Sequence, residues 1–148
     1  MTKKIFYSIF LVAIAVLLAC FSIIMGVLYD YSNTIQKNHM KDELELVAQA
    51  VETSGVQYLE RLETDSCRIT LVSSDGDVLY DSKTSADKME NHAKREEIKE
   101  ALKKGFGESS RYSATLTEET FYYAKKLANG NVVRVSVDHA TMLTLVLG

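Results

Sequence analysis

The chain has 148 residues, of which 47% are hydrophobic and 25% are charged, and it contains seven glycines and no proline. This length accommodates one modest domain with an appended segment, and the composition excludes an intrinsically disordered or collagen-like chain. The formal net charge of -3 gives no general attraction to nucleic acid, so we expect no nucleic-acid partner. Two cysteines, Cys20 and Cys67, do not make a disulfide framework.

The most distinctive segment is an uncharged apolar stretch over residues 5–29. As a helix with a rise of about 1.5 Å per residue, these roughly 25 residues span about 37 Å, more than the hydrocarbon core of about 30 Å requires. Lys3 and Lys4 precede the stretch and Asp30 follows it. The positive-inside bias therefore predicts a cell-membrane protein with residues 1–4 in the cytoplasm, a transmembrane helix over residues 5–29, and an extracytoplasmic domain from Asp30 onward.

Two alternatives for this stretch remain open from the sequence. One is a signal peptide cleaved near Ala19, and the other is a lipoprotein signal in which Cys20 carries the lipid. In both cases the apolar run would continue past the processing site, through Ile23 and Ile24. The chain also turns apolar at its end, which predicts the truncated start of a second transmembrane helix over residues 141–148, with an apolar tail docked on the domain as the alternative.

A long helix is predicted over residues 31–62, with an apolar stripe at spacings of four and three. Because this helix continues from the membrane span, the stripe predicts a parallel homodimer stalk. The alternative is that the same face packs on the chain's own domain, above all near Leu59 and Leu62, where the apolar surface widens. The stripe consists of Met40, Leu44, Val47, Val51, Ser54 and Tyr58.

The first strand pair of the predicted sheet encloses an Asp-Gly turn. Residues 68–72 and 77–81 are rich in apolar side chains, and Asp75 and Gly76 between them are a strong β-hairpin signal. A polar loop follows. Residues 94–104 then carry apolar side chains at helical spacing and lysines in the last turn, which predicts a helix.

Three further strands complete the predicted sheet, over residues 108–116, 120–127 and 132–137. Hairpin turns are expected at residues 129–131 and at residues 117–119. In the last strand, valines alternate with polar residues, which predicts one buried face and one face that meets water or a ligand.

This order of elements resembles the extracytoplasmic PAS-like sensor domain, of the single Cache type, found in bacterial receptors. The similarity is greatest to membrane sensor histidine kinases of the phosphate-regulon type in Gram-positive bacteria, and it extends over residues 1 to about 140. The motifs that carry it are RITLV at 68–72, DGDVLYDS at 75–82, MENH at 89–92, REEI at 95–98, GFG at 105–107, RYS at 111–113 and FYYA at 121–124.

The resemblance implies an α+β fold, in which a PAS-like domain over residues 30–140 has a five-stranded antiparallel sheet and one crossing helix. It implies the signal-sensing region of a two-component histidine kinase, which would transmit a stimulus across the membrane through a dimer. Similar sensors also belong to chemoreceptors and cyclic-dinucleotide enzymes. A further alternative is a membrane-tethered interaction module that binds an envelope protein.

Catalytic chemistry is not indicated by any motif. Family members carry a phosphoacceptor histidine followed by an acidic residue and Arg-Thr-Pro, and neither His39, His92 nor His139 has this context. The histidines are widely separated and form no Cys/His cluster, so we expect no metal site and no cofactor. Autokinase activity would belong to a longer parent protein. A pH-sensing role for His139 is the alternative to a polar boundary residue.

A binding site is implied by the resemblance, because the ligand pocket of a PAS-like fold lies between the sheet and the loop and helix that cross it. Arginine forks recognise carboxylate or phosphate, and tyrosine adds an apolar body with a polar tip, so a small anionic ligand would suit such a site. Alternatively, His92 and Arg95 only brace the loop through Asp81 or Glu90, and the tyrosines are ordinary sheet residues. The candidates are His92, Arg95, Arg111, Tyr112, Tyr122 and Tyr123.

Overall fold

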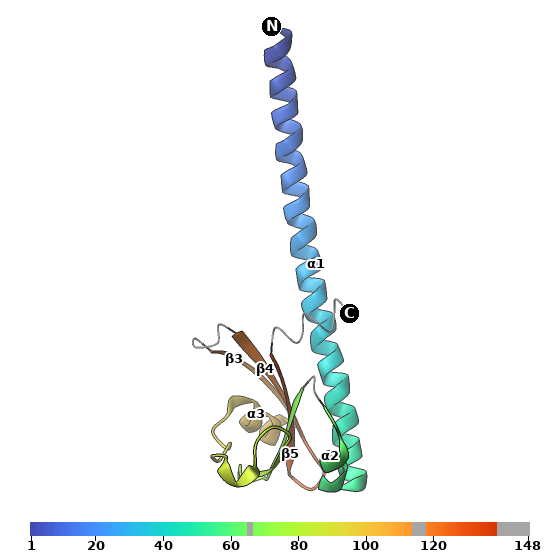
Figure 1. Cartoon of the computed structure of the whole chain (residues 1–148), viewed down its shortest axis with the longest axis vertical. Helices are drawn as coiled ribbons and strands as arrows, with labels where there is room; N and C mark the ends of the chain where they lie inside the picture. The colour runs from blue at the N-terminus through green and yellow to red at the C-terminus, as the bar shows by residue number, and fades with distance from the viewer. Residues whose placement is uncertain (65–66, 114–117, 139–148) are drawn as a thin grey trace. The chain divides into compact units, whose positions relative to one another are not determined.

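The computed structural model describes residues 1–64, 67–113 and 118–138, and the chain divides into two compact units, Met1–Asn38 and His39–Gly148. The first unit consists of the N-terminal part of helix α1, which runs over Thr2–Ser54 (Figure 1). The most apolar stretch of this helix has no residue buried within the chain. By length and composition, α1 is therefore able to cross a membrane.

The second unit contains an antiparallel sheet of five strands in the order β2-β1-β5-β4-β3. The predicted α+β class with a five-stranded antiparallel sheet is confirmed. Along the chain, the elements after α1 are α2 (Val56–Arg61), β1 (Arg68–Val72), β2 (Val78–Asp81), the short 3-10 helix η1 (Ala86–Lys88), α3 (Glu96–Lys104), β3 (Phe106–Ser113), β4 (Glu118–Lys126) and β5 (Val132–Asp138).

One face of this sheet packs on the end of α1 and on α2, and it forms the larger hydrophobic core. Every second residue of β5 points into this core, because strand side chains alternate between the two faces. From β1 and β5 the core takes Ile69, Leu71, Val133, Val135 and Val137.

The apolar stripe of α1 lies in this same core. Met40, Leu44, Val47 and Val51 are buried against the chain's own sheet, Tyr58 packs at the core's edge, and Ser54 is exposed. The expectation that the stripe faces a second copy is corrected for the four buried residues, because their apolar surface is already covered within one chain. A homodimer formed through other residues remains a prediction.

The opposite face of the sheet is covered in part by α3 (Figure 1). Ile98 and Ala101 of α3 pack on Val72, Ala124 and Val132 in a second, smaller core. The alternation in β5 is confirmed, but both faces of the strand are buried. Where α3 does not cover the sheet, polar side chains remain, and these form the site described below.

The end of the long helix and the start of β4 differ from those expected. The long helix ends at Ser54 because Gly55 adopts φ +70°, and α2 begins after it. The turn expected at residues 117–119 is wrong for Glu118 and Glu119, which pair with β3 as the start of β4. Thr117, His139 and the apolar segment 141–148 lie outside the described residues.

Candidate anion-binding site

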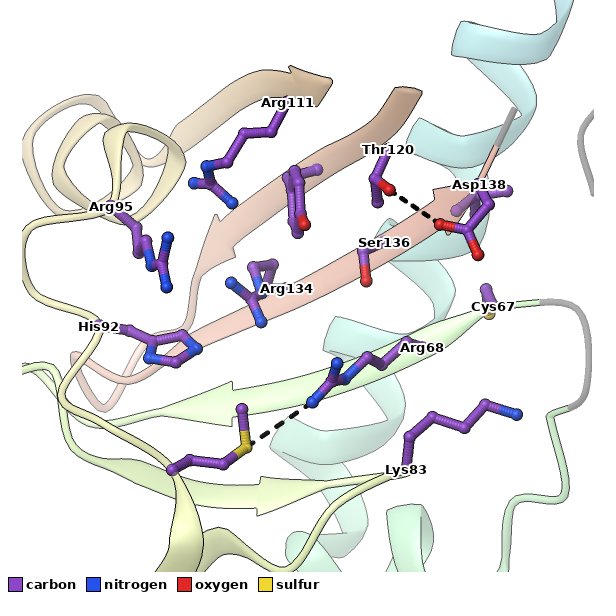
Figure 2. A pocket seen from close by; sticks show the side chains of 13 residues that line it. Cys67, Arg68, Lys83, His92, Arg95, Arg111, Thr120, Arg134, Ser136 and Asp138 are labelled. Atoms are coloured by element: carbon purple, nitrogen blue, oxygen red, sulfur yellow. Dashed lines mark hydrogen bonds between the residues drawn. The ribbon is translucent and has the colours of Figure 1, made fainter. Parts of the chain in front are cut away.

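A cavity of about 500 Å³ lies on the sheet face next to α3 (Figure 2). Strands β1, β3, β4 and β5 supply its floor, and the segment between β2 and α3 supplies one wall. Arg95, Arg111, Arg134 and His92 gather at one end, Thr120 and Asp138 lie at the other, and Arg68 lies between the two ends. The lining residues are Cys67, Arg68, Lys83, Met89, His92, Arg95, Arg111, Thr120, Tyr122, Arg134, Ser136, Val137 and Asp138.

The lining is strongly cationic. Asp138 is the one carboxylate among the described residues that line the cavity, and it accepts a hydrogen bond from Thr120 Oγ1 at 2.8 Å. A cleft lined by charges of one sign concentrates ligands of the opposite sign. The cavity is therefore suited to an anion, and its cations are Arg68, Lys83, Arg95, Arg111 and Arg134.

Arg134 of β5 lies at the centre of the floor and is only 4% exposed. Its Nη1 donates to Glu97 Oε1 at 3.2 Å, and its Nη2 donates to Thr70 Oγ1 at 3.2 Å. Its Nε is buried and, among the described residues, has no hydrogen-bond partner. A buried donor without a partner costs about 1–3 kcal/mol, so an acceptor placed beside this atom would be stabilising.

Glu97 of α3 is fully buried and joins two of these arginines. It accepts hydrogen bonds from Arg111 Nη2, from Arg134 Nη1, and from Ser109 Oγ at 2.6 Å. Burial acts to raise the pKa of Glu97, but the hydrogen bonds from Arg111 and Ser109 outweigh it and lower the pKa to about 2. The carboxylate is therefore ionised at neutral pH.

Tyr122 of β4 holds the two guanidinium groups from one side. The guanidinium carbon of Arg111 lies 4.1 Å from the centroid of the Tyr122 ring, and that of Arg134 lies 5.2 Å from it. Both distances fall within the range of cation–π interactions. The ring therefore orients two arginines that come from different strands.

Arg68 of β1 forms a second ion pair, with Asp81 of β2. Its Nε donates to both carboxylate oxygens of Asp81, at 3.1 and 2.9 Å, and Thr70 Oγ1 donates to the same carboxylate at 2.8 Å. Burial acts to raise the pKa of Asp81, but the Arg68 hydrogen bond and three others lower it. Because Thr70 also accepts from Arg134, one polar network connects α3 with β1 and β2.

His92 and Arg95 belong to the wall that leads into α3. The Nδ1 atom of His92 lies 2.7 Å from the Glu90 carbonyl oxygen, and since a carbonyl only accepts, we assign the ring proton to Nδ1. Burial, followed by the charge of Arg134, lowers the pKa of His92. The Arg95 guanidinium is exposed and makes no ion pair within the parts of the chain that the structure describes.

Four of the six residues suggested by the sequence line the cavity: His92, Arg95, Arg111 and Tyr122. Tyr112 is 64% exposed on the other face of β3, and Tyr123 is buried in the core against α1. Each is the strand neighbour of a cavity residue, and neighbours in a strand point to opposite faces. The suggested bracing of His92 through Glu90 is present as well, through the backbone carbonyl.

Sequence reasoning missed Arg68, Lys83 and Arg134, which also line the cavity. A usable signal existed for Arg134, because it alternates with Val133 and Val135 on what was expected to be the water or ligand face. Cys67 lines the cavity too, but burial raises the pKa of its thiol to about 12, so the thiol stays protonated.

No curated protein sequence matches the chain. Two solved structures are similar: the extracellular domain of rpHK1S-Z16, a candidate histidine kinase, and the Bacillus subtilis YkuI protein, which has an EAL domain and was solved with c-di-GMP and calcium. The first has a TM-score of 0.45 and 17% identity, the second 0.44 and 13%.

The aligned regions cover 63% and 73% of this chain but only 39% of rpHK1S-Z16 and 34% of YkuI, so the chain spans well under half of either structure. The model of the Single Cache-like family matches residues 30–136. This match includes the whole sheet except the end of β5, together with α3 and the cavity wall. The chain therefore belongs to the Single Cache-like family.

Proposed function

We propose that this chain is the signal-receiving region of a membrane receptor and that its second unit binds a small anion in the cavity. The observation that carries the proposal is the cationic lining around Arg134, whose buried Nε has no partner among the described residues. Membership of the Single Cache-like family supports a sensory role.

The available donors define the chemistry of the ligand. Arg134 Nε and the Arg95 guanidinium are not taken up by carboxylates of the described chain. Arginine forks bind carboxylate and phosphate groups with two parallel hydrogen bonds. The proposed ligand is therefore a small molecule that carries one of these groups.

The receptor arrangement is also a proposal. Residues 1–4 would be cytoplasmic, residues 5–29 would span the membrane, and the domain over residues 30–140 would lie outside, with a second span starting at residue 141. The parent would be a dimeric sensor histidine kinase of a two-component system, of the phosphate-regulon type of Gram-positive bacteria. The hydropathy of α1 supports the membrane span, and the family match supports the sensory role of the domain.

Signal transfer requires a ligand that distinguishes two arrangements of the domain. A ligand shifts such an equilibrium only by the difference between its affinities for the two states. The polar network from α3 through Arg134 to β1 and β2 is a suitable element, because an anion bound to these arginines would change the charge balance of all its members.

The test uses the full chain in lipid nanodiscs, titrated with inorganic phosphate and with succinate by calorimetry. We expect at least one of the two to bind, and Arg95→Ala to weaken that binding by about tenfold, the loss of one charge-assisted contact. Lys94→Ala is the matched control, since Lys94 is exposed and does not line the cavity. Absence of binding by both anions, or equal losses in the two variants, would contradict the proposed site.

A further inference from the structure

Glu97 lies behind the cationic end of the cavity. It is fully buried, it is not among the residues that line the cavity, and it reaches Arg111 and Arg134 from the α3 side. The Arg111 side chain is 31% exposed and does line the cavity. The same two guanidinium groups therefore face Glu97 on one side and the cavity on the other.

This carboxylate is firmly held in its charged form. Ser109 Oγ donates to it at 2.6 Å, and both arginines donate to it. Its negative charge opposes any anionic ligand that binds the same guanidinium groups, and because Glu97 and Arg134 are buried, this repulsion is weakly screened.

We propose that Glu97 is a specificity-determining residue of the cavity: its fixed charge lowers the affinity for anions, and lowers it more for ligands of higher charge. This inference rests on the proposed anion-binding function. The electrostatic energy between Glu97 and a ligand is proportional to the charge of the ligand. In free energy, the penalty for a dianion is therefore about twice the penalty for a monoanion. Because affinity depends exponentially on free energy, the fold-change in affinity for the dianion is about the square of the fold-change for the monoanion.

The experiment compares succinate with succinamate, its monoamide, which has a similar shape and one negative charge less. Full-length chain in nanodiscs is titrated at pH 7, with Glu97→Gln as the test variant. We expect Glu97→Gln to tighten succinate binding by about tenfold and succinamate binding by about threefold. Glu96→Gln is the matched control, because Glu96 is the exposed neighbour in the first turn of α3 and loses the same charge.

A second measurement covers the case in which Glu97→Gln does not fold, as judged by circular dichroism. In wild-type chain labelled with ¹³C at glutamate carboxyl groups, succinate should shift the Glu97 resonance and leave the Glu96 resonance in place. An unshifted Glu97 signal at saturating succinate would overturn the proposal.

The outcomes separate this inference from the proposed function. Binding to the wild type with unchanged or weaker binding to folded Glu97→Gln, or an equal gain for both ligands, would overturn the role of Glu97 and leave the anion site standing. Failure of both ligands and of inorganic phosphate to bind either protein would overturn both, and phosphate binding that Glu97→Gln leaves unchanged would overturn the role of Glu97 alone.

Discussion

The backbone N–H of His92 donates to the carbonyl oxygen of Gly76 at 2.7 Å. This bond fastens the cavity wall to the β1–β2 turn, and Asn91 reinforces it by donating to the Asp75 carbonyl and to Asp77 Oδ1, at 3.1 and 2.8 Å. The Asp-Gly-Asp motif at residues 75–77 and the Asn-His motif at residues 91–92 thus bind each other directly. The turn sets the position of His92 in the cavity.

Gly76→Ala should break this contact. Gly76 has φ +92°, and an added Cβ would lie 2.5 Å from both Cβ and N of Ala93. We expect a loss of about 2–4 kcal/mol in the free energy of unfolding, measured by denaturant titration, from the left-handed backbone and the clash together.

Gly130→Ala is the control for Gly76→Ala, because Gly130 has φ +90° but its added Cβ would meet nothing nearer than 3.9 Å. It should lose about 1–2 kcal/mol, the backbone component alone. Equal losses in the two variants would show that the contact between turn and wall contributes little.

Leu44→Ala tests the placement of the apolar stripe. Leu44 is 1% exposed in the core of the chain, so its truncation should lower the free energy of unfolding by about 2–5 kcal/mol. Leu46→Ala, which removes a side chain that is 68% exposed on the same helix, should change it by less than about 0.5 kcal/mol. Sedimentation should give the same oligomeric state for both variants. Dissociation of a dimer by Leu44→Ala without loss of protomer stability would contradict the assignment to the core.

Acid should destabilise the domain in part through His92. Its pKa is lower in the folded state than in the unfolded chain, because burial and then the charges of Arg134 and Arg95 disfavour the imidazolium. The Glu90 carbonyl and Glu97 favour the imidazolium, but their effect is smaller. The unfolded chain therefore binds more protons below about pH 6.5, and stability falls as the pH decreases through this value.

His92→Asn should make stability less dependent on pH between 7 and 5, as measured by urea unfolding, because Asn does not titrate and its amide can donate to the Glu90 carbonyl as Nδ1 does. His39→Asn, at an exposed position on α1, serves as the control. The same pH slope in His92→Asn and wild type would exclude His92 as a source of the acid effect.

Topology is testable with single introduced cysteines in intact cells. Ser74→Cys lies on an exposed turn and should react with a membrane-impermeant maleimide, whereas Thr2→Cys should react only after the cells are made permeable. Wild-type chain provides the background, and there Cys67 is buried with a pKa of about 12. Protection of Ser74→Cys in intact cells would contradict an extracytoplasmic domain.

Local patterns were sufficient for most of the fold. The apolar run in β1 and the alternation in β5 identify these strands, because side-chain direction in a strand depends on residue parity alone. The Asp-Gly pair located the first hairpin because its backbone preference is local. Gly55 interrupts the predicted helix, and apolar spacing alone does not reveal this, since apolar residues at helical spacing continue past Gly55 from Val51 to Tyr58 and Leu59.

The site was only half predictable for a physical reason. The sequence determined which residues share a face within one strand, the apolar character of residues 5–29, and the presence of arginines that suit an anion. Tertiary structure alone decided that β5 lies between β1 and β4, which brings Arg68, Arg111 and Arg134 to one cavity. It also decided that α1 covers one face of the sheet, so that four residues of its stripe lie in the core, and that Glu97 meets two arginines distant in sequence. The physical reason is that strand order and helix packing depend on contacts that no local pattern encodes.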